Sequence, residues 1–513
     1  MTATNLPPSK PTQVASFEDP GARALSRVGV VDVGSNSVRL VVFDGAARSP
    51  AYYYNEKLMC GLGAGVRETG RLNPDGRERA LQALKRFQAI AKSLRIEPLS
   101  AVATAAVREA DDGEDFRREV AETTGLDLRV IDGPEEARLS AQGVLLGWPG
   151  SYGLVCDIGG SSMELATIAG GKIGTCVTSQ LGPLRLKGIK GGKKAVAAYI
   201  KEVVNDLSDQ IGPQSDRLFL VGGSWRAIAR IDMLRRGYPL HVLHEYRMSV
   251  KGARETIKFI RKTDVAELRS MSGNSAARMA LVPLAAEVLS RLLKKFKPAD
   301  IAISSYGIRE GLLYEKMPQH LRDMDPLIES CRFSEAKDAR LPGFGDVLYN
   351  FVHPLFKSRP ESWLRIVHAA CLLHDVSWRA HPDYRAESCF DNATRANLGG
   401  LKHVERVFLG LALLHRYKNK REGNRFDTLA KLLSEEDLHA AEILGKAMRF
   451  GAMMWMQSDT RPGKFKWYPR KKLLELYLAD KARPLFGEVA TARLQSLANS
   501  LGAEVDVKRL RDT

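Results

Sequence analysis

Two short motifs combine an aspartate with glycine and small polar residues, and both follow runs of β-branched residues. The first reads Asp-Val-Gly-Ser-Asn-Ser at 32–37, and the second reads Asp-Ile-Gly-Gly-Ser-Ser at 157–162. A turn of such residues can bring its backbone N–H groups close to a phosphate. An aspartate at a strand end offers oxygen ligands to Mg²⁺. One such turn is weak evidence, because turns use these residues anyway, but the pair predicts a phosphoryl-binding site.

The segments around the first motif follow a definite order. Asn73 as N-cap and Pro74 at the first helical position mark the start of one helix. The order βββαβαβα predicts one α/β lobe over residues 25–147. Its strands and helices are expected at 27–33, 38–44, 51–58, 74–95 (helix), 99–104, 113–124 (helix), 126–132 and 134–147 (helix).

The same order starts again after residue 147 and predicts a second lobe over 148–317. Because a repeat places equivalent turns at equivalent edges, we expect the two motifs to face each other across a cleft. A helical insertion is expected at 250–295. The other elements are expected at 152–158, 162–168, 172–179, 192–209 (helix), 217–221, from 224 (helix), 301–305 and 307–316 (helix).

The two ends of the chain differ from the lobes. Residues 1–24 contain no apolar run and predict a disordered leader. After residue 318 the strand signals fade and a Leu- and Ala-rich period near 3.6 predicts helices. We expect a helical domain at 318–440 and a C-terminal helical subdomain at 441–513. The predicted fold class is therefore α/β, with two lobes followed by an all-α region.

The composition narrows the classes of partner. The formal net charge is +17, so the chain should attract polyanions, among which nucleic acid, anionic membrane and polyphosphate all qualify. None of the six cysteines has CxxC spacing, which argues against a disulfide framework and a zinc ribbon. No apolar run approaches the ~20 residues that span a bilayer. We therefore predict a cytoplasmic protein without a membrane partner.

Seven segments together resemble a known family. The chain resembles the bacterial exopolyphosphatases and guanosine-pentaphosphate phosphatases, within the superfamily of actin, sugar kinases and heat-shock chaperones. This resemblance implies two ribonuclease H-like lobes, an HD-like helical domain and a homodimer. It rests on VDVGSNSVRL, ATAAVREA, GPEEARLSAQGV, CDIGGSSMEL, SQLGPLRL, VGGSWRAIAR and SSYGIREGLL, which occur in the family's order.

The resemblance assigns a base and an arginine. Glu136 lies in the first turn of the helix that begins at Pro134, where the helix dipole favours an ionised carboxylate. It matches the family's catalytic glutamate, which directs a water molecule. Arg108 matches the family's phosphate-contacting arginine, whose guanidinium suits bidentate binding. The alternatives are a carboxylate that only complements the helix dipole and a solvated arginine.

The turns are expected to hold a cation and a phosphoryl group. Asp32 and Asp157 would hold Mg²⁺, with Mn²⁺ as the alternative ion, and the resemblance adds Glu164 as a ligand. An Asx turn is the alternative for a single aspartate. The phosphate-binding residues are expected to be Gly34, Ser35, Asn36, Ser37, Gly159, Gly160, Ser161 and Ser162.

Three positions depart from the family. Ser161 and Met163 replace its usual glycine and threonine, and Ala280 replaces its usual aspartate. A serine at 161 would be strained if the turn required a positive φ there. Control of the substrate by the second lobe is therefore less firmly predicted than control by the first.

A polymer also needs a basic path that leads away from the cleft. The glycine-rich loop at 187–194 could form this path, and so could a second lysine cluster at 294–297. The alternative for either cluster is an ordinary solvated surface. The polyphosphate channel is expected to be formed by Arg185, Lys187, Lys190, Lys193 and Lys194.

The segment at 222–227 either accepts a nucleoside or allows tight helix–strand packing.

His374 and Asp375 form a His-Asp pair like that of metal-dependent HD phosphohydrolases. Such a site needs further ligands, for which His353 and Asp391 are the candidates. Their spacing is not compelling, so we expect a core or capping role for the pair.

The function that these observations favour is hydrolysis of the terminal phosphoanhydride of inorganic polyphosphate. Hydrolysis of guanosine pentaphosphate (pppGpp) is the alternative with the same chemistry, because both substrates end in a phosphoanhydride. An ATP-dependent small-molecule kinase and a non-catalytic polyphosphate-binding protein are more distant alternatives. Nucleic acid is not expected as a partner.

Overall fold

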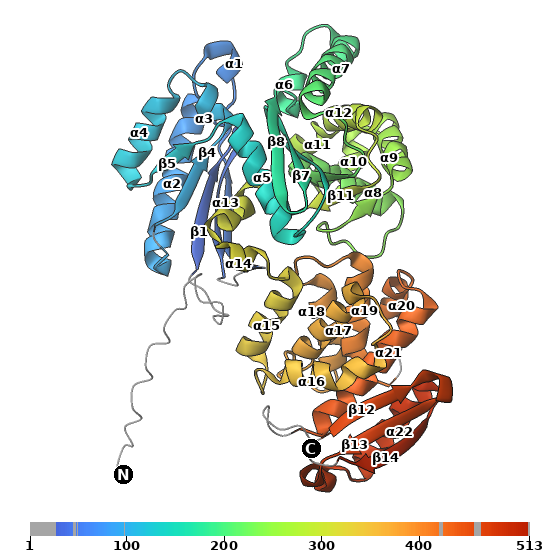
Figure 1. Cartoon of the computed structure of the whole chain (residues 1–513). Coiled ribbons are helices and arrows are strands. Elements are labelled where there is room, and N and C mark those ends of the chain that lie inside the picture. The colour runs from blue at the N-terminus through green and yellow to red at the C-terminus, as the bar shows by residue number, and fades with distance from the viewer. Residues whose placement is uncertain are drawn as a thin grey trace, which may run out of the picture.

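The computed structural model describes residues 27–44, 48, 50–96, 98–419, 424–455 and 463–510. Two lobes lie side by side above a helical domain, and a small sheet forms the far end of the molecule (Figure 1). The leader predicted at 1–24 lies outside the described residues. Within the described part of the chain, no helix is long and apolar enough to cross a lipid bilayer.

Lobe I has the strand and helix order that the sequence predicts, with two short helices, α1 and α3, in addition. Its sheet has the order β3-β2-β1-β4-β5, in which β1 is antiparallel to β2 and parallel to β4. Its elements are β1 (Val28–Val33), β2 (Ser37–Phe43), β3 (Tyr52–Met59), α1 (Val66–Thr69), α2 (Pro74–Leu94), β4 (Ser100–Ala103), α3 (Ala105–Glu109), α4 (Gly113–Thr124), β5 (Leu128–Val130) and α5 (Gly133–Gly147).

Lobe II repeats this order around a sheet of order β10-β11-β9-β6-β7-β8. The predicted insertion is helical, as α9 to α12, and the short strand β10 is an addition. Its elements are β6 (Gly153–Ile158), β7 (Met163–Ala169), β8 (Lys172–Ser179), α6 (Pro183–Lys187), α7 (Gly192–Ile211), β9 (Arg217–Val221), α8 (Gly223–Arg235), β10 (Arg247–Met248), α9 (Val250–Lys262), α10 (Val265–Ser272), α11 (Ala276–Met279), α12 (Val282–Lys295), β11 (Ile301–Ser304) and α13 (Ile308–Lys316).

Two helices join the lobes to each other. Helix α5, the last of lobe I, packs on β6, β7 and β8 of lobe II, while α13, the last of lobe II, packs on α5 and on β1 (Figure 1). The helices meet at glycines, because a Cβ at Gly143 would lie 2.3 Å from the Gly307 carbonyl oxygen. A Cβ at Gly311 would lie 1.9 Å from the Leu139 carbonyl oxygen. One apolar core therefore includes residues of both lobes, and it fixes how α5 faces the cleft.

The start of α5 is determined locally. Asp132 is the N-cap, and its side chain accepts a 2.7 Å hydrogen bond from the Glu135 N–H. Pro134 stands in the first turn, where its missing N–H costs nothing. The helix therefore begins where the sequence predicts, and this start places Glu136 in its first turn.

Among the described residues after α13, the elements up to residue 453 are helices, as predicted, and the remainder departs from the all-α prediction. The last segment contains a three-stranded sheet, in which β13 is antiparallel to β12 and parallel to β14. The strands do alternate, as Lys-Phe-Lys-Trp, Leu-Glu-Leu-Tyr-Leu and Val-Asp-Val-Lys, so the sequence carried a strand signal that the all-α prediction overlooked. The elements are α14 (Gln319–Arg322), α15 (Pro326–Asp338), α16 (Phe344–Val352), η1 (His353–Leu355), α17 (Glu361–Leu373), α18 (Arg385–Arg395), α19 (His403–His415), α20 (Asn424–Ala430), α21 (Glu435–Met453), β12 (Gly463–Tyr468), η2 (Pro469–Lys471), β13 (Leu473–Leu478), η3 (Asp480–Leu485), α22 (Glu488–Leu501) and β14 (Glu504–Arg509).

Candidate active site

The two Asp-x-Gly motifs form turns of the same geometry. The Gly34 N–H donates to the Ser37 carbonyl at 3.0 Å, and the Gly159 N–H donates to the Ser162 carbonyl at 3.0 Å. Each turn joins the first two strands of its lobe. Ser161 does not adopt a positive φ, so a serine there carries no left-handed strain.

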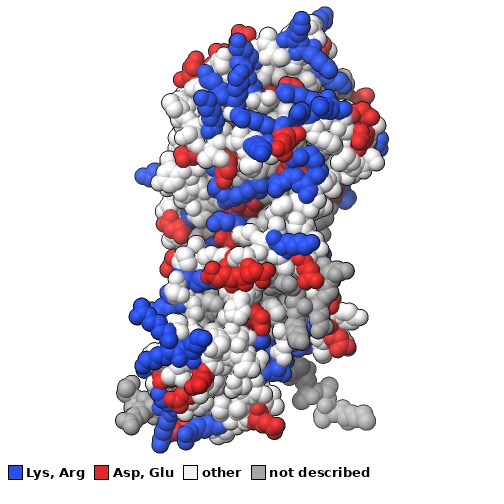
Figure 2. Space-filling model, turned by 90° about the vertical axis from the view of Figure 1, so that its right-hand side faces the viewer, with Lys and Arg blue, Asp and Glu red and all other residues white. Residues whose placement is uncertain are grey.

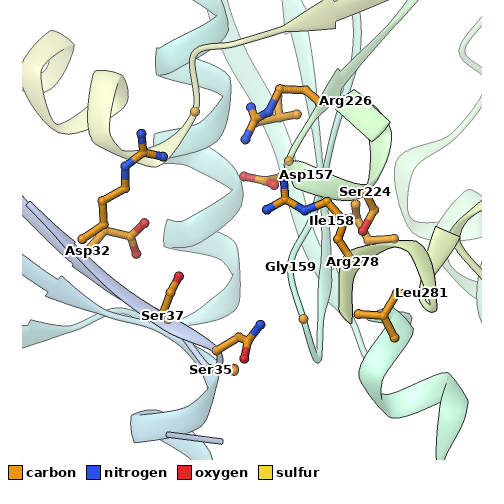
Figure 3. A pocket seen from close by; sticks show the side chains of 18 of the residues that line it. Asp32, Ser35, Ser37, Asp157, Ile158, Gly159, Ser224, Arg226, Arg278 and Leu281 are labelled. Atoms are coloured by element: carbon orange, nitrogen blue, oxygen red, sulfur yellow. The ribbon is translucent and has the colours of Figure 1, made fainter. Parts of the chain in front are cut away.

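The turns meet at one cleft between the lobes, with a volume of about 1020 Å³. A Cβ built on Gly160 would lie 3.8 Å from the Ser35 Cβ, so the two turns lie close together. Asp32 and Ser35 approach from one side and Asp157 and Gly159 from the other (Figure 3). The predicted site residues that line the cleft are Asp32, Gly34, Ser35, Asn36, Ser37, Glu136, Asp157, Gly159, Gly160, Ser161 and Ser162.

Glu136 reaches the cleft from the first turn of α5, and its side chain is almost fully buried. Burial and the neighbouring Asp157 carboxylate raise the pKa of Glu136 to about 8, against the opposing effect of Arg108. The helix terminus was expected to favour the ionised form, but loss of hydration outweighs it. Without a bound cation, Glu136 is therefore a stronger base that is mostly protonated at neutral pH.

Arg108 does not line the cleft. From helix α3, its Nη1 donates to the Ile131 carbonyl at 2.7 Å and to the Glu136 Oε2 at 3.4 Å. The neighbouring residues Thr104 and Ala105 do line the cleft. In this arrangement Arg108 holds the carboxylate of Glu136, and direct contact with a phosphoryl group, as the resemblance implied, would require it to move.

Asp32 and Asp157 have the chemistry of a divalent-cation site. Burial raises the pKa of both carboxyl groups, and the charge of Asp32 further raises the pKa of Asp157. A cation between them would relieve both effects. Among the described residues, no group of three or more His, Cys, Asp and Glu side chains converges as a metal site. The two carboxylates therefore fit a cation such as Mg²⁺ that keeps water and substrate oxygens as its other ligands.

Glu164 does not line the cleft with these two aspartates. It lies on β7, opposite Asp157 on β6, and its side chain is 1% exposed. Its Oε1 accepts a 3.0 Å hydrogen bond from the Thr178 hydroxyl. Burial and the neighbouring Glu136 raise the pKa of Glu164 well above its ordinary value. Glu164 thus lies behind the cleft lining and beside Glu136, and its role as a cation ligand stays a prediction.

Six cationic side chains that sequence reasoning did not assign to the site also line the cleft. Desolvation and the guanidinium groups of Arg278 and Arg39 lower the pKa of Lys57 to about 8. The cations therefore repel one another across the cleft, and a bound polyanion would relieve this repulsion. Arg226 and Arg278 point towards Asp157 (Figure 3). The six residues are Arg39, Lys57, Arg226, Arg230, Arg278 and Arg309.

Some of these cations had a signal in the sequence. Arg39 stands two residues after Ser37 on β2, so strand alternation puts it on the same face as Ser37. Arg226 and Arg309 lie in the first turns of helices that follow strand ends, within segments that carried the family resemblance. Lys57 and Arg278 had no local signal, because only packing brings β3 and α11 to the cleft.

The predicted polyphosphate channel lies away from the cleft lining. None of its five residues, in or after α6, lines the cleft, although the adjacent Leu184 does. The cluster at 294–297 does not line it either. Lys and Arg side chains gather over the half of the molecule that holds lobe II (Figure 2). A path along that surface stays a prediction.

The segment at 222–227 allows tight helix–strand packing, and part of it also lines the cleft. Gly222 has φ 115°, and a Cβ there would lie 2.6 Å from the Ile158 carbonyl oxygen, so this glycine allows α8 to approach the second turn. Trp225 is fully buried in the core of lobe II. Ser224 and Arg226 line the cleft, together with residues 273–275, so the cleft extends beyond the turns into lobe II.

His374 and Asp375 have structural contacts, as the sequence favoured. The Nδ1 of His374 lies 2.8 Å from the Cys371 carbonyl oxygen, and burial lowers the pKa of His374 to about 4. Asp375 pairs with Arg340 at 2.5 Å. Neither His353 nor Asp391 joins them in a metal-binding group among the described residues.

Comparisons with known proteins agree with this geometry. The model of the Ppx/GppA phosphatase family matches residues 41–320, and the model described as exopolyphosphatase, C-terminal, matches residues 357–507. "Exopolyphosphatase 1" of Mycobacterium tuberculosis (strain ATCC 25618 / H37Rv) is 27% identical over 317 residues, which cover 59% of this chain and 92% of that protein. "Exopolyphosphatase 1" of Mycobacterium leprae (strain TN) is 26% identical over 304 residues, which cover 57% and 89%.

A solved structure shares the fold of the lobes. The crystal structure of an exopolyphosphatase from Cytophaga hutchinsonii ATCC 33406 aligns with a TM-score of 0.53 and 25% identity. The alignment covers 57% of this chain and 98% of that chain. The match thus spans nearly the whole of that chain.

Proposed function

Because the chain belongs to the Ppx/GppA phosphatase family and is a hydrolase, we propose that it releases orthophosphate from the end of inorganic polyphosphate. The observation that carries this proposal is the cleft itself, where two equivalent turns and six cations surround three carboxylates. Mutually repelling cations favour a substrate with many negative charges. The exopolyphosphatases that the chain resembles act on the same class of polymer.

The turns would bind the terminal phosphoryl group. Their backbone N–H groups and hydroxyls come from both lobes and would hold this group from two sides. Asp32 and Asp157 would hold a divalent cation, which neutralises charge on the transferred phosphoryl group when bound. Arg226 and Arg309 would contact the oxygens of the polymer that follow it.

Glu136 would direct the attacking water. It faces the same cleft as the two turns, and its raised pKa makes it a stronger base than an ordinary glutamate. Arg108 would hold its carboxylate in place through the 3.4 Å contact. The water then attacks phosphorus, the bond to the bridging oxygen breaks, and the shortened polyphosphate leaves with orthophosphate as the second product. Phosphoryl transfer of this kind needs positioning and charge neutralisation more than a covalent nucleophile.

Hydrolysis of pppGpp is the second candidate, and one observation favours it. The cleft continues past the turns along residues 222–227 and 273–278, which leaves room for a group larger than a phosphate. The alternative differs from the first in substrate and not in the chemistry at Glu136.

Orthophosphate release from long-chain polyphosphate and from pppGpp, each with Mg²⁺, tests the proposal. We expect kcat/KM to be higher for polyphosphate, and removal of the cation with EDTA to abolish release. Preference for pppGpp would establish the second candidate. Release from neither substrate by a folded protein would refute both.

A further inference from the structure

Ser140 is a buried polar residue behind the cleft lining, and the proposed function leaves it without a role. It stands one turn after Glu136 on α5, so both side chains lie on the same face of the helix. Its side chain is 0% exposed, and its hydroxyl donates a hydrogen bond to the Asp157 Oδ2. A serine inside a helix commonly bonds to a carbonyl of the preceding turn. The hydroxyl of Ser140 is instead directed at the carboxylate of a neighbouring strand.

The surroundings of Asp157 explain why this bond matters. Asp157 stands near the end of β6, where Gly222 closes one side, since a Cβ there would lie 3.1 Å from Oδ1. Gly307 lies near the other oxygen, since a Cβ there would lie 3.9 Å from Oδ2. The bond from Ser140 holds Oδ2, so rotation of the carboxylate would break it. One hydrogen bond therefore restrains how Asp157 presents its oxygens to a cation.

The two lobes differ in this respect. Guanidinium groups favour the ionised form of both aspartates, Arg309 and Arg39 at Asp32 and Arg226 and Arg309 at Asp157, and only Asp157 has the bond from Ser140 in addition. A guanidinium attracts a carboxylate without fixing which oxygen faces the cleft. Ser140 has a single hydroxyl on a helix that glycine contacts hold against α13. The second turn is thus supported by a directional bond from the same helix that carries Glu136.

We propose that Ser140 is a positioning residue that fixes the carboxylate of Asp157 for the divalent cation. Helix α5 would then hold the base and the cation-binding carboxylate in one rigid arrangement. The proposal rests on the cation assignment of the proposed function. Groups that orient a metal ligand in this way typically change metal affinity about 10- to 100-fold when they are lost.

Binding of Mn²⁺ to the full-length protein, followed by the electron paramagnetic resonance signal of the free ion, tests this role without substrate. Ser140→Thr and Ser140→Val form a matched pair, because the two side chains have the same shape and differ only in the hydroxyl. We expect the dissociation constant for Mn²⁺ to rise about tenfold in Ser140→Val relative to Ser140→Thr. Ser330→Ala, which removes a buried hydroxyl from α15 outside the cleft, should leave the affinity unchanged.

Two further measurements separate a positioning role from a structural one. With polyphosphate, Ser140→Val should lower kcat while KM stays near that of Ser140→Thr. In an Asp157→Asn background, the two substitutions at 140 should give equal Mn²⁺ affinities, because Ser140 acts only through Asp157. Should Ser140→Val prove unstable, Ser140→Ala removes the hydroxyl with less steric change.

The Mn²⁺ measurements separate the role of Ser140 from the assignment of the cation site. Equal Mn²⁺ affinities of Ser140→Thr and Ser140→Val, in a parent protein that binds Mn²⁺, would overturn the role of Ser140 and leave the proposed function standing. A folded parent that does not bind Mn²⁺ would overturn the cation assignment together with the role of Ser140.

Discussion

The first and second phosphate turns have the same backbone and different surroundings. Both close with a 3.0 Å hydrogen bond from glycine N–H to serine carbonyl, and both follow the first strand of a lobe. Arginine charges act on both aspartates, but Asp157 also accepts a hydrogen bond from the Ser140 hydroxyl and lies against Gly222. A duplicated sequence thus repeated the cradle, while residues from other elements gave each aspartate a distinct environment. The two turns have the same backbone shape, but substitutions in them are expected to have different effects on activity.

Glu136 has a counterpart in Glu310, in the first turn of α13, but Glu310 accepts hydrogen bonds from the Gly307 N–H and the Tyr52 hydroxyl. Only Glu136 of these two lines the cleft, so its loss should have the largest effect. We expect Glu136→Gln to lower kcat on polyphosphate about a thousandfold, because amide nitrogen and oxygen cannot accept the proton of water. Orthophosphate release in single-turnover experiments measures this effect. Activity within tenfold of the parent would remove the base assignment.

The same variant has an opposite effect on stability. Folding raises the pKa of Glu136 from 4.5 to about 8, so the parent loses stability as the pH rises from 4.5 to about 8, because the unfolded chain releases this proton before the folded one does. Glu136→Gln lacks this ionisation. We expect its Tm to exceed that of the parent at pH 9 and the difference to shrink at pH 6, as measured by calorimetry without divalent cations.

Asp32→Asn and Asp157→Asn compare the two turns directly. If both carboxylates hold the cation, each change should lower kcat/KM about 100-fold and raise the Mg²⁺ concentration needed for half-maximal rate. Titration of the rate with Mg²⁺ gives both quantities. A loss confined to one of the two variants would show that one turn binds the cation alone.

The pH dependence of the rate should follow the base. Because Glu136 must be deprotonated to accept a proton and its pKa is about 8, log kcat/KM should rise with pH towards 8. A bound cation lowers this pKa, so higher Mg²⁺ concentrations should move the rise to lower pH. Profiles at two Mg²⁺ concentrations test this; a profile that is flat from pH 6 to 9 at low Mg²⁺ would contradict the raised pKa.

Gly222→Ala should disturb the second turn and leave the first intact. The new Cβ would lie 2.6 Å from the Ile158 carbonyl oxygen at φ 115°, which we expect to cost about 1–3 kcal/mol of unfolding free energy and to lower kcat/KM severalfold. Gly212→Ala is the matched control, because φ is 78° there and nothing lies within 4 Å of the Cβ position. If urea unfolding gave the same loss of unfolding free energy for both variants, backbone strain alone would explain it, and the contact with the Ile158 carbonyl oxygen would contribute nothing.

The smallest effects are expected from single cations. Lys57→Met removes a cleft cation, so KM should rise a fewfold for tripolyphosphate and for long polyphosphate alike. Lys190→Met removes a loop cation away from the cleft lining, so KM should rise only for the long chain, if the loop guides the polymer. Steady-state kinetics with both substrates tests this, and no effect of Lys190→Met on either would remove the loop from the path.

The sequence determined the features that depend on neighbours along the chain. Asn73, Asp132 and Pro134 act within one turn, so the starts of α2 and α5 could be read directly. The two Asp-x-Gly turns and the order of strands and helices were equally local, and they sufficed for the family and for the position of Glu136. Near the C-terminus the same reading missed β12 to β14, although each has a short alternation of apolar and polar residues, because each strand is only six residues long and stands beside helical segments.

Tertiary structure decided everything that depends on groups distant in the chain. Ser140 meets Asp157 across 17 residues, and Lys57 and Arg278 reach one cleft from different lobes. It also placed Arg108 behind Glu136 and left Glu164 outside the cleft. Loss of hydration raised the pKa of Glu136 against the helix dipole, because burial is set by everything packed around a residue. Local sequence fixes a turn, but only packing fixes the dielectric surroundings and the charges that its side chains meet.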